Sequence, residues 1–147
     1  MIIDAHVHPV LFGPICKDPE RVQFRKQQFG LYKSSPIPME QVMAVMDHAG
    51  VDLAILFAED YSALMGQSIV SNEEIRLLMD AQPGRFAGFA SVDPRNEDAP
   101  EELARAFTEL KLDGLKLNLS HLQMYPDDAR LQPLYELCLA HNKIGRA

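Results

Sequence analysis

The feature that most constrains the fold is a regular alternation of short apolar runs with helical patterns. Four runs are typical of strands, at residues 2–7, 52–57, 85–92 and 114–119. The second run, DLAILF, is continuously apolar, as in strands that are buried on both faces of a parallel sheet. Helical patterns follow at residues 39–50, 71–84, about 98–110 and from 127 to about 142. This alternation predicts parallel βαβ units and therefore an α/β fold.

Local signals mark the ends of the predicted helices. Ser71 and Glu74 have the spacing of a capping box, and Pro83-Gly84 ends the helix that they begin. Gly50 supplies a stop for the first helix, and Pro100 stands in the first turn of the third. These signals support the assignment of helices between the apolar runs.

Residues 9–38 separate the first strand from the first helix and are predicted to form a long first βα loop. Arg21, Arg25 and Lys26 lie in this polar and aromatic stretch, where they could meet a carboxylate substrate as a lid. Loops of this length are either functional or mobile. The sequence leaves both interpretations open.

Chain length limits the number of such units. The 147 residues suffice for one domain with a single core, residues 1–147. An eight-unit barrel typically needs about 250 residues, so four units amount to half of one. The alternative is an unrelated small α/β domain, such as a response-regulator-like sheet, which would need a fifth strand or a different strand order.

Composition excludes several classes of partner. The chain has 14 Lys and Arg against 21 Asp and Glu, a formal charge of −7, which argues against nucleic-acid binding. No apolar run approaches the ~20 residues needed to cross a bilayer, and the N-terminus lacks the features of a signal peptide. Cys16 and Cys138 belong to no CxxC motif, which favours a reducing compartment. We therefore expect a cytoplasmic protein that binds neither nucleic acid nor membrane.

The first strand carries the motif DAHVH. Alternate side chains of a strand point to the same face, so Asp4, His6 and His8 are predicted to lie together. Two imidazoles at this spacing can bind one divalent cation. Zinc is the first expectation because it takes nitrogen ligands and keeps a position open in catalytic sites, with manganese or another divalent metal as the alternative. Asp4 could orient one imidazole, although an HxH pair also occurs by chance in proteins without a metal.

Other candidates follow the strands at the same edge of the sheet, where parallel α/β proteins place their sites. Lys116, Asn118 and His121 come at or after the fourth strand and are candidates for substrate contact or for supporting the metal ligands. For Asn118, hydrogen bonding to the loop backbone is the stronger interpretation, and for His121, an exposed loop position. Glu59 and Asp60 follow the second strand and could line the same mouth, but a solvated acidic loop is the stronger interpretation.

Two stretches resemble a known family. The opening IIDAHVHP looks like the first strand of the amidohydrolase superfamily. Residues 72–118 resemble its amidohydrolase-related branch, which includes metal-dependent hydrolases and aromatic-acid or aminocarboxymuconate-type decarboxylases. The most telling pieces are Asn72, PGRF at 83–86, VDP at 92–94 and GLKL at 114–117. The resemblance implies the N-terminal half of a (β/α)8 TIM-type barrel, with a metal at the C-terminal mouth.

The resemblance also implies roles for particular residues. His6 and His8 match the paired metal ligands of the family's first strand. The remaining ligands, two histidines and an acid/base aspartate, have no matching position, so we expect them beyond Ala147. Residues 144–147 do not fit the family's fifth strand, which suggests a frameshift or truncation. Some superfamily members carry a metal-bridging carboxylated lysine at the end of strand four, but this branch mostly uses one metal, so a polar or substrate contact, or simple burial of its stem, is expected for Lys116.

Three functions stay open on this resemblance. The first is metal-dependent hydrolysis of an amide or ester-like bond, and the second is non-oxidative decarboxylation of an aromatic or muconate-type acid. In both, the substrate is a small carboxylate- or amide-bearing molecule. The third is a catalytically inactive half-barrel, in which the open edges of strands one and four pair with another chain to give a homo-oligomer.

Overall fold

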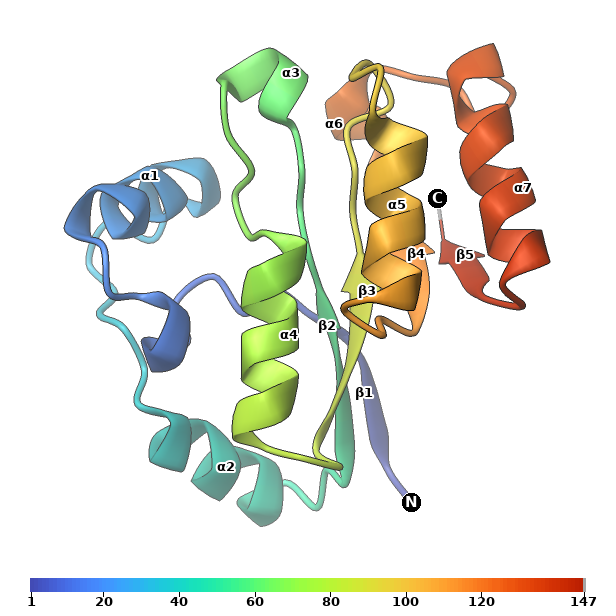
Figure 1. Cartoon of the computed structure of the whole chain (residues 1–147). Helices are drawn as coiled ribbons and strands as arrows, with labels where there is room; N and C mark the ends of the chain where they lie inside the picture. Colours follow the sequence, from blue (N-terminus) through green and yellow to red (C-terminus); the bar gives the residue numbers. More distant parts are fainter. Residues whose placement is uncertain (147) are drawn as a thin grey trace.

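The computed structural model describes residues 1–146. A single five-stranded sheet runs through them, all its strands are parallel, and each pairs with the next in sequence (Figure 1). The strands are β1 (Ile3–Val7), β2 (Leu53–Phe57), β3 (Phe86–Ala90), β4 (Gly114–Lys116) and β5 (Ile144–Arg146). The predicted parallel βαβ units are therefore confirmed.

The helices occupy the connections between strands. α4 and α5 lie against the same face of the sheet, in front of β2 and β3 in Figure 1. Short helices follow β2 and β4 at the carboxyl edge. The helices are η1 (Gly13–Ile15), α1 (Pro19–Phe29), α2 (Met39–His48), α3 (Ser62–Met65), α4 (Asn72–Ala81), α5 (Ala99–Thr108), α6 (Leu119–Leu122), η2 (Ala129–Leu131) and α7 (Gln132–Ala140).

The strand order excludes the response-regulator-like alternative. In a doubly wound sheet the order reverses at a switch point, as in 2-1-3-4-5. Here the order is consecutive from β1 to β5. A consecutive parallel order is the one in which a (β/α) barrel is built.

The fifth strand was not among the four strands predicted from the sequence. Ile144 and Gly145 pair with Gly114 and Leu115 of β4 in a parallel ladder. A ladder uses main-chain groups, so a strand can form there without the family's side chains. The outer strands of the sheet are consequently β1 and β5, rather than the first and fourth.

The segment 9–38 is also more ordered than a loop. It contains η1 and α1, and Asp18 caps α1 by accepting hydrogen bonds from the backbone of Glu20 and Arg21. Arg25 is fully buried and donates to the carbonyls of Ile15 and Ile69, each at 2.8 Å. The prediction of a substrate-binding lid is therefore wrong for Arg25, which ties α1 to the rest of the core.

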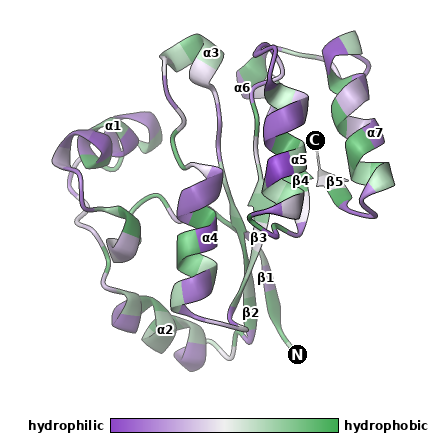
Figure 2. Cartoon of the chain, viewed as in Figure 1, coloured by the Kyte–Doolittle hydropathy of each residue, from purple (hydrophilic) through white to green (hydrophobic). Residues whose placement is uncertain are grey.

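Hydrophobic packing between the helices and the sheet makes up the core. Figure 2 shows the strands mostly in hydrophobic colours, whereas hydrophilic and hydrophobic residues alternate along α4 and α5. Ile75 and Leu78 of α4, with Leu103 of α5, are fully buried. The predicted capping box of α4 is present, with Ser71 and Glu74 bonded to each other's backbone. No helix in the described part of the chain is long and apolar enough to cross a bilayer.

Candidate metal centre

His6 and His8 lie side by side at the carboxyl end of β1. Their Nε2 atoms are 2.8 Å apart, and their ring centroids are 4.7 Å apart. The ring of Phe57, at the end of β2, packs edge-on against His6 with centroids 4.9 Å apart. The predicted pairing of the two imidazoles is present in the structure.

Asp4 does not join this pair, contrary to the prediction from simple alternation. The register of β1 against β2 shifts between Asp4 and Val7, which pair with Ala54 and Leu56. Three steps along β1 thus match two along β2, which is the signature of a β-bulge. Asp4 and Val7 consequently line a hollow against α2, whereas the histidines line another at the carboxyl edge. The Asp4 carboxylate accepts a hydrogen bond from the backbone N–H of His6 at 3.1 Å.

The carboxylate that lies beside His8 is that of Glu59. Its side chain is buried, with 4% of the residue exposed, so the interpretation as a solvated loop carboxylate is wrong. Its Oε1 accepts hydrogen bonds from Lys116 Nζ at 2.9 Å and from the Tyr61 hydroxyl at 3.3 Å. Backbone hydrogen bonds of 2.8 Å with Val70 and Ile69 hold the residue after β2.

The Nδ1 atom of His8 is buried and lies 3.4 Å from Glu59 Oε1. The two atoms are close but do not have the geometry of a hydrogen bond in this structure. Burial lowers the pKa of His8 below its ordinary value, while the Glu59 carboxylate opposes this shift. Burial also raises the pKa of Tyr61, with a further contribution from Glu59, so the phenol stays a hydrogen-bond donor.

A hollow of about 470 Å³ opens beside the two histidines, within the range of small-molecule sites. Lys116 and Asn118 contribute to its wall, as predicted from their position after strand four. Asn118 also caps α6, since its Oδ1 accepts from the backbone of His121 at 3.3 Å. The remaining lining residues are Leu117, Leu119, Ser120 and Pro126.

His121 occupies a different position from the other candidates. Its ring stacks on that of Tyr61, with centroids 4.6 Å apart and planes 18° apart. The residue is exposed and does not line the hollow that the paired histidines share. His121 is linked to the paired histidines indirectly, because the Tyr61 on which it stacks donates a hydrogen bond to Glu59.

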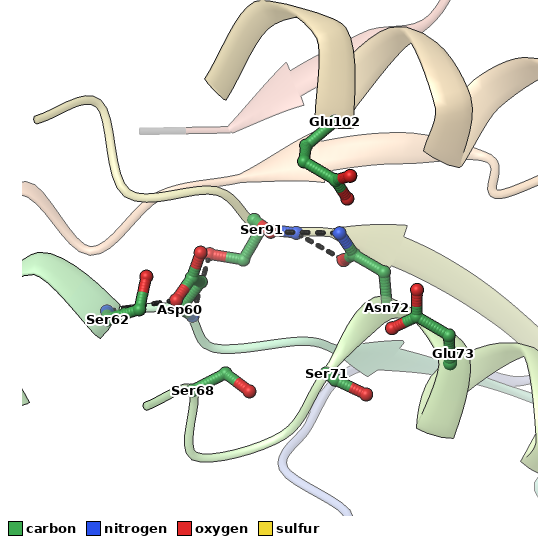
Figure 3. Close-up of a pocket in the computed structure, with 8 residues that line it drawn as sticks. All are labelled: Asp60, Ser62, Ser68, Ser71, Asn72, Glu73, Ser91 and Glu102. Carbon is green, nitrogen blue, oxygen red and sulfur yellow. Dashed lines mark hydrogen bonds between the residues drawn. The ribbon is translucent and has the colours of Figure 1, made fainter. Parts of the chain in front are cut away.

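A second, polar cavity of about 220 Å³ lies between the end of β3 and the helices α4 and α5 (Figure 3). Several of the side chains that line it form hydrogen bonds with the backbone of neighbouring segments. The Asn72 amide donates to the carbonyl of Ser91 at 3.1 Å and accepts from its N–H at 2.9 Å. Asp60 accepts from the backbone of Ser62 and Asp93 at 2.9 and 3.1 Å. Asn72, which was quoted for the family resemblance, therefore ties α4 to Ser91 after β3. The Asp93 carboxylate, from the quoted VDP segment, accepts from the backbone N–H of Ala63 at 3.1 Å.

The histidine pair fits a divalent cation in its donor chemistry. It offers two imidazole nitrogens that lie 2.8 Å apart, and imidazole nitrogen is a ligand that zinc takes. Within residues 1–146, however, no three His, Cys, Asp or Glu side chains form a group that could hold a metal. A cation held here would take two ligands from the described residues and the rest from other donors.

The sequence did contain a signal for Glu59. The residue follows β2 directly, and β2 neighbours β1 in a parallel sheet, so Glu59 and His8 end at the same edge. What the sequence could not show is its burial, which depends on Lys116, 57 positions away, and on the bridge to Val70.

Comparisons with known proteins agree with this architecture. A family model described as Amidohydrolase matches residues 3–142. No curated protein matches the sequence significantly.

Several solved structures share the fold. A TIM-barrel protein from Bordetella bronchiseptica has a TM-score of 0.63 and 24% identity, over 93% of this chain and 51% of its own. The 4-oxalomesaconate hydratase from Rhodopseudomonas palustris has a TM-score of 0.67 and 22% identity. The match covers 99% of this chain and 51% of the hydratase chain. The 5-carboxyvanillate decarboxylase from Novosphingobium aromaticivorans has a TM-score of 0.68 and 20% identity. The match covers 99% of this chain and 49% of the decarboxylase chain, whose structure is complexed with manganese and 4-hydroxy-3-methoxy-5-nitrobenzoic acid.

These likenesses confirm the predicted fold. The chain spans about half the length of the solved structures that it matches. Its five parallel strands and the intervening helices form a curled half of a (β/α)8 barrel.

Proposed function

The chain belongs to the amidohydrolase family, and on that premise we propose that His6 and His8 form one wall of a divalent-metal site for chemistry on a small carboxylate- or amide-bearing molecule. The observation that carries the proposal is the 2.8 Å approach of their Nε2 atoms at the carboxyl end of β1. Active sites of parallel α/β barrels lie at that edge. A bound cation would supply Lewis-acid activation of water or of a substrate carbonyl or carboxylate.

The residues of the chain itself would hold and orient the substrate. Lys116 lines the hollow beside the histidines, and Glu59 takes one of the three donors of its ammonium group. A substrate carboxylate could accept from another. The Phe57 ring packs against both histidines, with centroids 4.9 Å from that of His6 and 6.0 Å from that of His8.

We propose hydrolysis of an amide or ester-like bond as the reaction, with non-oxidative decarboxylation of an aromatic or muconate-type acid as the second candidate. The decarboxylase from Novosphingobium aromaticivorans supports the second, because it shares the fold and is complexed with manganese and a benzoic acid. The same comparison makes manganese the alternative to zinc. A cytoplasmic location is proposed on the two cysteines, which are free thiols in the structure.

Metal titration tests the proposal directly. Purified chain is titrated with Zn²⁺ and separately with Mn²⁺, by calorimetry and by the electron paramagnetic resonance of free Mn²⁺. We expect one ion per chain, and at least a tenfold loss of affinity in His6→Ala and in His8→Ala. His48→Ala is the matched control, since His48 lies at the exposed end of α2 and should leave affinity unchanged. Equal affinity in all four proteins would contradict the proposal.

An assay then separates the two reactions. Metal-loaded protein is incubated with aromatic and unsaturated dicarboxylic acids, and with their amides and lactones. Release of CO₂ identifies decarboxylation, and release of a new carboxylate without CO₂ identifies hydrolysis. Either activity should fall in His6→Ala and persist in His48→Ala.

A further inference from the structure

We propose that Glu59 is a positioning residue for His8. Its carboxylate holds the imidazole in the tautomer that carries the proton on Nδ1, so that the lone pair of Nε2 faces His6. The inference rests on the proposed metal site, because it assigns a role toward that site, but it also makes a claim about the metal-free protein.

The first step of the argument concerns the buried Nδ1 atom of His8. It is shielded from water and has Glu59 Oε1 at 3.4 Å. If Nδ1 carried a lone pair, a carboxylate oxygen would lie 3.4 Å from it, which is repulsive. If it carries a proton, the same contact becomes favourable.

The second step concerns the opposite side of the ring. In a neutral imidazole one nitrogen donates and the other accepts. With the proton on Nδ1, the Nε2 of His8 is the acceptor in the 2.8 Å contact, and His6 Nε2 is the donor. A nitrogen must present a lone pair to bind a metal, so this tautomer leaves His8 ready for ligation.

The third step is that Glu59 is itself held firmly. It is buried, and the Lys116 ammonium and the Tyr61 hydroxyl both donate to the oxygen that faces His8. Its backbone is bridged to Val70. A carboxylate fixed from two sides can orient a neighbouring ring, whereas a mobile one could not.

Glu59→Leu tests the proposal because it removes the carboxylate oxygen that lies beside the Nδ1 atom of His8. Without that oxygen, a proton on Nδ1 loses the charge that favours it. The preference of His8 for the Nδ1–H tautomer should then be lost. Tyr61→Phe is the matched control: it removes another partner of Glu59 but leaves the carboxylate beside His8.

Nitrogen NMR of the metal-free chain, at alkaline pH where the imidazoles are neutral, reads the tautomer of each histidine. We expect His8 as the Nδ1–H form in the wild type and in Tyr61→Phe, and loss of that preference in Glu59→Leu. A wild-type His8 in the Nε2–H form, or one that averages both, overturns the proposal whether or not the variants fold.

Metal affinity provides the second readout. We expect a 10- to 100-fold loss of Zn²⁺ or Mn²⁺ affinity in Glu59→Leu and less than a threefold change in Tyr61→Phe. Wild-type affinity in Glu59→Leu would overturn the positioning role. If the wild type binds no metal, the proposed function fails, and the tautomer measurement still decides the state of His8.

Discussion

At the scale of single residues, burial and partners separate the site from the scaffold. The pairing of His6 with His8 was predictable because their spacing alone fixes it. Glu59 was not, because its partner Lys116 arrives from a distant strand. Arg25 was misjudged for the same reason: a charged side chain in a polar stretch is usually exposed, yet here it is fully buried.

Arg25 gives a prediction about stability. Replacing Arg25 by Met leaves Glu74 and two backbone carbonyls without their buried donor, so unfolding should become easier by about 3–5 kcal/mol. Urea denaturation followed by circular dichroism measures this. Arg76→Met is the control, because Arg76 pairs with the exposed Asp80 and should cost less than about 1 kcal/mol. Equal losses would show that Arg25 is not a core residue.

Gly88 tests the packing between β3 and α4. A Cβ at this position would lie 2.5 Å from both Ile75 and Met79. We expect Gly88→Ala to lower the free energy of unfolding by about 1–3 kcal/mol through overpacking. At Gly145 the nearest atom is Cys138 Sγ at 3.7 Å, so Gly145→Ala should change stability little. A neutral Gly88→Ala would mean that α4 packs less tightly than described.

At the scale of elements, the sequence correctly predicted helices and strands where the signals lie close to the element that they specify. The capping box, the strand–helix alternation and the helix stops all lie within a few residues of what they specify. β5 escaped prediction because its pairing with β4 is a main-chain interaction, and Gly114 allows the close approach: a Cβ there would lie 2.7 Å from the Ile144 carbonyl. α1 escaped because the polar run that contains it has no strong apolar periodicity.

The capping box of α4 gives a prediction at this scale. Ser71→Ala removes the side-chain acceptor for the backbone N–H of Glu74 and should cost about 0.5–2 kcal/mol of stability. Thermal unfolding compared with Ser35→Ala, at an exposed position, measures the difference. If the two variants unfold at the same temperature, the cap contributes nothing to the stability of α4.

At the scale of the whole molecule, the described chain is a half-barrel with two outer strands. β1 pairs only with β2, and β5 only with β4, among the described residues. The four-strand count would have allowed two copies to close one eight-stranded barrel. Two copies with five strands each have ten strands, which is more than an eight-stranded barrel holds. We therefore expect copies to associate through the edges of their sheets without closing an eight-stranded barrel.

Self-association is therefore a prediction about the edge of β1. Ile3 is 43% exposed there, and unpaired edges invite pairing. We expect the mass measured by light scattering to rise with concentration in the micromolar range, and Ile3→Lys to shift the chain toward the monomer. Leu139→Lys is the control, since Leu139 is 81% exposed but lies on α7. A compact monomer at all concentrations would contradict the prediction.

The bulge in β1 decides which face of the sheet carries the two imidazoles. With one extra residue between Asp4 and Val7, the histidines line the hollow at the carboxyl edge while Asp4 and Val7 line the hollow against α2. In a regular strand of the same sequence, His6 and His8 would share the face of Asp4 and would lie toward α2. A variant that straightens β1 is therefore expected to move both histidines away from the carboxyl-edge hollow without changing either of them.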